Sequence, residues 1–89
     1  MKAIDVNRRI EVKMTDDRIF AVEAEKGTSI AELKQLIGEA SHVPANEQLL
    51  LHSNGRGNTI QLESDRTVAD YYGLIGGTVH LVVRKQKVI

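Results

Sequence analysis

The sequence contains no cysteine, which excludes a disulfide framework, a thiol nucleophile and a thiolate metal site. It also contains no long hydrophobic run, since no stretch approaches the ~20 apolar residues of a membrane-spanning helix. Residues 1–9 lack the apolar segment that is typical of a signal peptide. We therefore expect no membrane association and a location in the cytoplasm, the nucleus or both.

An excess of charge of one sign is missing as well. Twelve Lys and Arg balance twelve Asp and Glu, so the formal net charge is zero. A neutral chain has no global field that would attract nucleic acid or an anionic membrane. The 89 residues are enough for one modest hydrophobic core and not for two. We expect a single small domain.

Alternation of apolar and polar residues predicts two strands in the first part of the chain. The pattern has period two over Ile10–Met14 and again over Phe20–Ala24. Asp16 and Asp17 lie between the two runs, so the segment is interpreted as a hairpin. The turn lacks the glycine that would fix its type.

A helix is predicted next. Ser29, with Glu32 three residues later, has the pattern of a capping box. Apolar residues then recur at helical spacing: Ile30, Leu33, Ile37 and Ala40. The pattern predicts a helix from about residue 29 to about residue 40, and Pro44 prevents its continuation. Because Gly38 costs about 1 kcal/mol relative to alanine, we expect this helix to depend on packing against a sheet.

The second half of the chain predicts three more strands and a long loop. The strands begin at Leu49, span residues 60–62 and span residues 78–84. Thr67 and Asp70 have the spacing of a second capping box and predict one short helical turn. Residues 53–59 contain two glycines, two asparagines and no apolar anchor, which predicts a mobile loop.

Several of these segments resemble the ubiquitin family over the range from about Ile10 to Arg84. The segments are the helix with Lys34, the exit at Val43-Pro44, the run from Asp65-Arg66-Thr67 to Asp70-Tyr71, and Thr78-Val79-His80-Leu81-Val82-Val83-Arg84. The resemblance implies an α+β fold, the ubiquitin-like β-grasp, in which a mixed four-to-five-stranded sheet packs on one α-helix. It also implies that Tyr71 braces the loop before it by a hydrogen bond to the backbone.

The resemblance further implies three regions. A ubiquitin-like domain is expected at residues 10–84, after a flexible N-terminal extension at residues 1–9. Residues 85–89 are interpreted as a C-terminal tail or the start of a linker, without a diglycine.

The two faces of the sheet follow from the parity of the strand residues. A sheet that a helix covers on one face needs apolar residues at every second position. In the last two long strands the helix-facing set is Leu50, Val79, Leu81 and Val83. The opposite parity holds Leu49, Leu51, His80 and Val82. Three of these four are apolar and no segment is left to cover them, so the sequence predicts an exposed interaction site.

In ubiquitin-like proteins this surface binds ubiquitin-binding helices and proteasomal adaptors. The residues expected to bind partners are Leu49, which replaces a family arginine, with Leu51, His80, Val82 and Arg84. Together with the missing diglycine, the resemblance implies a non-conjugated protein-protein interaction domain from a larger protein of the ubiquitin-proteasome system. We expect a monomer that docks on ubiquitin-binding domains and on proteasomal or ligase adaptors. Packing of this surface against a neighbouring domain of a longer chain is an alternative.

A second alternative is a ubiquitin-like modifier. Such a modifier is attached through a terminal diglycine, whereas the sequence given ends in Val88-Ile89. We therefore expect the domain to bind rather than to be conjugated. The alternative is a modifier, or one half of a tandem modifier, whose diglycine lies outside this sequence.

Other classes of function have weaker signals. The basic clusters are Arg8-Arg9 and Arg84-Lys85-Lys87. They are expected at opposite ends of strands roughly 20 Å long, without an aromatic residue between them, which argues against nucleic-acid binding. No nucleophile, base and orienting group stand at compatible positions, so we expect no enzyme and no cofactor. His42 and His52 lack partners at ligand spacing, so no metal site is predicted.

Overall fold

The computed structural model describes residues 8–53 and 57–84. Its elements are β1 (Arg9–Met14), β2 (Ile19–Glu23), α1 (Ile30–Ser41), the 3₁₀ turn η1 (Ala45–Glu47), β3 (Gln48–Ser53), β4 (Thr59–Gln61), the 3₁₀ turn η2 (Val68–Asp70) and β5 (Thr78–Val83). Most of the predicted extension at residues 1–9, the centre of the predicted loop at 53–59 and the predicted tail at 85–89 lie outside the described residues.

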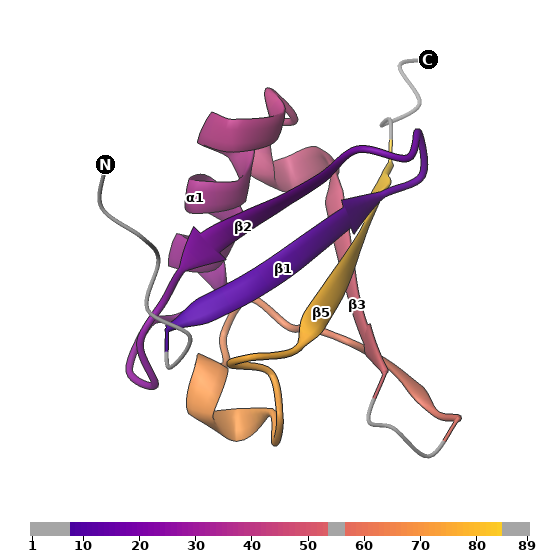
Figure 1. Cartoon of the computed structure of the whole chain (residues 1–89). Coiled ribbons are helices and arrows are strands. Elements are labelled where there is room, and N and C mark those ends of the chain that lie inside the picture. Colours follow the sequence, from indigo (N-terminus) through magenta and orange to yellow (C-terminus); the bar gives the residue numbers. More distant parts are fainter. Residues whose placement is uncertain (1–7, 54–56, 85–89) are drawn as a thin grey trace, which may run out of the picture.

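The strands form one five-stranded mixed sheet in the order β2-β1-β5-β3-β4 (Figure 1). The central pair β1 and β5 is parallel, and the other three pairs are antiparallel. The α-helix α1 lies across one face of the sheet, behind β1 and β2 in Figure 1. A mixed sheet on the single α-helix of the described residues confirms the predicted β-grasp.

The hydrophobic core lies between α1 and the sheet. The helix contributes Ile30, Leu33 and Ile37, and the sheet contributes Ile10, Val12, Leu50, Val79 and Leu81, all with no exposed surface. Of the predicted helix-facing set, Val83 is not buried with the others, because it is 37% exposed. Val83 is the last residue of β5 and pairs with Gln48 at the very start of β3, so its parity is correct but it lies beyond the fully buried layer.

The turn between β1 and β2 spans four residues, 15–18, and is closed without glycine. Asp17 adopts a left-handed conformation with φ of 71°, which aspartate tolerates better than most residues. The backbone N–H of Met14 donates to the Arg18 carbonyl at 2.9 Å, and that of Asp17 to the Met14 carbonyl at 3.2 Å. Asp16 accepts bonds from the backbone N–H of Arg18 and from its guanidinium, and the backbone bond in particular holds the pKa of Asp16 below its ordinary value.

Both predicted capping positions form hydrogen bonds. The Ser29 hydroxyl accepts the backbone N–H of Glu32 at 3.1 Å, which is half of the predicted capping box. Thr67 and Asp70 form a complete box, and the short turn η2 follows as predicted. The hydroxyl of Tyr71 accepts the backbone N–H of Glu63 at 2.8 Å, which confirms that this tyrosine braces the preceding loop.

Gln48 joins β3 to the middle of α1 and to the segment after the helix, from inside the core. Its side-chain Nε2 donates to the carbonyls of Lys34 at 2.7 Å and Val43 at 2.9 Å. A Cβ on Gly38 would lie 3.0 Å from the Val43 carbonyl oxygen and 3.3 Å from the Gln48 Nε2. Glycine at position 38 therefore gives room for this close approach, which its helix propensity alone does not indicate.

Candidate protein-interaction face

The sheet has the two faces that its sequence parity predicts. Leu50 and Leu81 have no exposed surface, whereas their neighbours Leu49, Leu51 and Val82 are half-buried and His80 is exposed. We call the face turned away from α1 the outer face. The four residues Leu49, Leu51, His80 and Val82 form the outer-face patch.

Strand pairing brings these four side chains together. β3 and β5 are antiparallel, with Leu49 opposite Val82 and Leu51 opposite His80. Residues directly opposite each other in such a pair have Cβ atoms roughly 5 Å apart and point to the same face. The patch is therefore one compact block of two cross-strand pairs.

The pairing also shows what borders the patch. On β1, Lys13 is opposite His80, and on β2 Ile19 is opposite Lys13. Ile19 is 61% exposed and extends the apolar surface beyond the lysine. Ile19 is not among the site residues predicted from the sequence, although its parity is opposite to that of Phe20 and therefore indicates the outer face.

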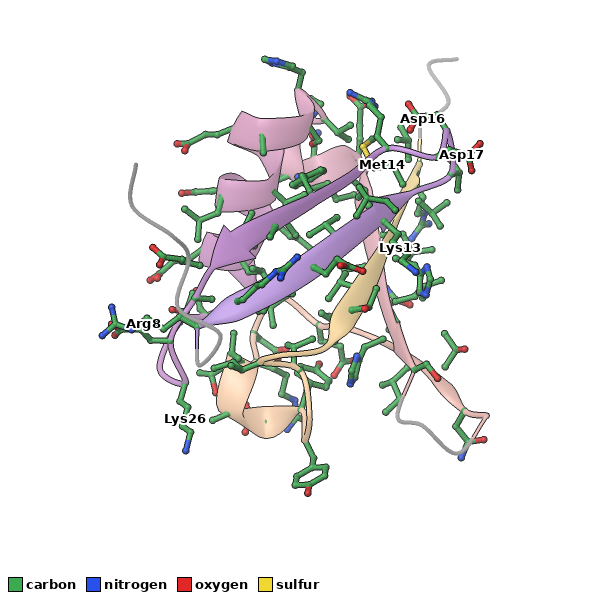
Figure 2. The ribbon with its side chains drawn as sticks, viewed as in Figure 1. Arg8, Lys13, Met14, Asp16, Asp17 and Lys26 are labelled. Atoms are coloured by element: carbon green, nitrogen blue, oxygen red, sulfur yellow. The ribbon has the colours of Figure 1, made fainter. Side chains whose placement is uncertain are left out.

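An exposed cation, Lys13, lies at this border. The ion pairs among the described residues are Arg8–Glu25, Arg9–Glu11, Arg18–Asp16 and Arg66–Glu63, and none of them includes Lys13 or His80. Figure 2 shows Lys13 on β1 near the turn that carries Asp16 and Asp17, with Arg8 and Lys26 at the opposite end of the hairpin. The surface thus combines apolar side chains with an exposed cation, which would complement an apolar partner segment with an acidic border.

Arg84 lies apart from the other predicted site residues. It follows the last residue of β5, and its backbone N–H donates to the Glu47 carbonyl at 2.6 Å. With Lys34 of α1 and Asn46 of η1 it lines an open cavity of about 380 Å³. We therefore do not include Arg84 in the outer-face patch.

The other two histidines have different positions. His42 is exposed and ends α1 with φ of 64°. His52 shares the parity of Leu50 and is only 4% exposed, a position that the sequence analysis did not assign. Within residues 8–53 and 57–84, no group of three His, Cys, Asp or Glu side chains could hold a metal ion. In the same ranges, no helix has the length and apolar character needed to cross a membrane.

Comparison with known protein families agrees with the fold. The chain matches the model of the ubiquitin family over residues 10–86. This range contains α1, four complete strands and all but the first residue of β1, and it includes the whole outer-face patch. The match over most of the chain, together with a five-stranded mixed sheet on one α-helix, shows that the chain belongs to the ubiquitin family.

Proposed function

We propose that this ubiquitin-family domain is a non-conjugated protein-protein interaction domain that docks through the outer-face patch. The observation that carries the proposal is the pairing of Leu49 with Val82 and of Leu51 with His80 on the face that α1 leaves open. Clustered apolar surface of this kind marks interaction sites on folded domains. The exposed Ile19 supports the proposal because it enlarges the apolar area.

The proposed partners are ubiquitin-binding domains and the adaptors of proteasomes or ligases, in the cytoplasm or nucleus. The family membership supports this choice of pathway. The exposed Lys13 beside His80 supports partners whose docking segment carries an apolar stripe with an acidic residue next to it. Such a segment would place its apolar side chains on the leucines and its carboxylate near the lysine.

Alanine substitutions in the patch test the docking proposal. Leu51→Ala and Val82→Ala should each weaken binding to a responsive ubiquitin-binding domain by about 1 to 2 kcal/mol, as expected for a central contact. That loss corresponds to roughly 5- to 30-fold in Kd, measured by isothermal titration calorimetry against a panel of such domains.

Leu36→Ala is a matched control, because Leu36 is a 37% exposed leucine on α1 rather than on the outer face. The Kd of the Leu36→Ala variant for these ubiquitin-binding domains should equal that of the unmodified protein. Equal losses for Leu36→Ala and Leu51→Ala, or no binding to any member of the panel, would contradict the proposal.

Non-conjugation is tested separately, because a modifier could use the same face for docking. The natural full-length polypeptide is incubated with a ubiquitin-family activating enzyme and ATP, and the products are separated on a non-reducing gel. No thioester adduct is expected. An adduct would favour the modifier alternative while leaving the docking result intact.

A further inference from the structure

His52 is a buried histidine whose two ring nitrogens both face backbone carbonyl oxygens. Nδ1 lies 3.2 Å from the carbonyl oxygen of Thr78, and Nε2 lies 3.4 Å from that of Tyr72. A neutral imidazole has one N–H and can donate to only one of these oxygens, whereas an imidazolium donates to both. The geometry therefore offers a complete set of hydrogen bonds only to the protonated ring.

The segment that carries these carbonyls, residues 72–78, packs closely against the ring. A Cβ at Gly77 would lie 3.4 Å from the His52 Cε1, an ordinary van der Waals distance, so this part of the segment is next to the ring. The segment is also bound to β1, because the N–H of Gly76 donates to the Arg9 carbonyl at 2.6 Å and the N–H of Glu11 to the Gly77 carbonyl at 3.0 Å. It leads directly into β5, where His80 and Val82 contribute to the outer-face patch.

Among residues 8–53 and 57–84, several titratable side chains stand on the elements next to the ring, and no hydrogen bond joins any of these side chains to it. They are Arg9 and Glu11 on β1, His80 on β5, and Tyr71 and Tyr72 in the adjoining segment. Arg9 pairs with Glu11 at 3.6 Å. His80 belongs to the outer face, Tyr71 is bonded to Glu63, and Tyr72 is 98% exposed.

Within the described strands, the positions beside His52 on its own face carry no charged side chain. Its register neighbours are Ile60 on β4 and Val79 on β5, and the inner face of β3 adds Gln48 and Leu50. A change in the charge of the ring therefore acts first on the two carbonyls.

We propose that His52 is a pH-sensitive latch on the segment 72–78. In the neutral ring, the shorter contact, from Nδ1 to the Thr78 carbonyl, assigns the single N–H to Nδ1. The Tyr72 carbonyl then faces the lone pair of Nε2. Protonation adds an N–H at Nε2, and the second, charge-assisted bond fastens Tyr72 to β3. The latch closes when the ring is protonated as the pH falls, and it opens when the ring loses that proton as the pH rises.

NMR spectroscopy of the folded protein tests the latch. Ring ¹⁵N signals should show protonated Nδ1 and unprotonated Nε2 at high pH, and two protonated nitrogens at low pH. Amide exchange of Gly76 and Gly77, expressed as protection factors to remove the intrinsic effect of pH, should slow roughly three- to tenfold on acidification, as expected for one added hydrogen bond. His52→Phe, which keeps a ring without an N–H, should abolish this change, whereas His42→Gln and His80→Gln should retain it.

Several results would overturn the inference. A ring that stays neutral from about pH 8 to about pH 5 in the folded state would do so. Protonation of the His52 ring without a change in the amide protection of Gly76 and Gly77 would also overturn the inference. If His52→Phe fails to fold, the ring and amide signals of the unmodified protein still decide the question. These results are independent of the docking proposal, because no partner is present in the sample.

Discussion

Leu50 and Leu51 are adjacent leucines that should respond very differently to truncation. Leu50 has no exposed surface and is paired with Leu81, which is also fully buried, beneath α1. Leu50→Ala removes its transfer free energy and leaves a cavity, at a cost of about 2 to 5 kcal/mol. Because the core around Leu50 is closed on all sides, we expect a value in the upper half of that range.

Leu51 is half-buried on the outer face, where water can occupy the space that truncation leaves. Leu51→Ala should therefore cost no more than about 0.5 to 1 kcal/mol. A small domain of this size is stable by about 5 to 15 kcal/mol in all, so the first variant would lose a large share of its stability and the second very little.

Urea denaturation followed by circular dichroism measures the contrast. With an m-value of roughly 1 kcal/mol/M, the midpoint should fall by about 3.5 to 5 M for Leu50→Ala and by less than about 1 M for Leu51→Ala. A Leu50→Ala chain that is unfolded without urea would meet the same expectation. Equal midpoints for the two variants would show that the assignment of the two faces is wrong.

Three other changes test local features. Asp17→Gly should raise the free energy of unfolding by roughly 0.5 kcal/mol, because glycine adopts the positive φ without strain, and thermal unfolding would detect it. Gly38→Ala should not give the usual helix gain of about 1 kcal/mol, because its Cβ would crowd the Val43 carbonyl; a measured gain would show that the site has room. The backbone N–H of Thr67 lowers the pKa of Asp70 from 3.8, so the stability from this bond is present above that pH and is lost as pH falls through the lowered pKa. Thermal unfolding between about pH 5 and about pH 2 should show this loss in the unmodified chain and less of it in Asp70→Asn.

The features that the sequence predicted depend on local patterns. The alternation around Leu50 and Leu51 is enough to assign their faces, because strand geometry turns successive side chains to opposite sides. The capping positions Ser29 and Thr67 were recognisable for the same reason, since a cap and the N–H that it accepts lie within one helical turn.

The features that the sequence did not predict depend on contacts between distant segments. Gln48 and His52 are polar residues on the inner face, and each is accommodated by backbone carbonyls from other parts of the chain. Polarity alone indicates exposure for such residues, so their burial could not be derived before the fold was known. Val83 shows the opposite case, since it is an apolar residue with inner-face parity that is exposed. Parity assigns a residue to a face of the sheet, but it does not indicate how far along β5 the helix α1 covers that face.

The parallel pairing of β1 with β5 has a consequence for synthesis on the ribosome. The first and last strands of the described fold lie side by side at the centre of the sheet. The hairpin of β1 with β2 and the pair of β3 with β4 are made from neighbouring stretches and can form as the chain emerges, but β5 must arrive before the two halves share a sheet. A nascent chain that stops short of Thr78 lacks β5, the strand that joins the two halves of the sheet. The complete sheet, and with it the cooperative fold, can therefore form only after β5 has been synthesised.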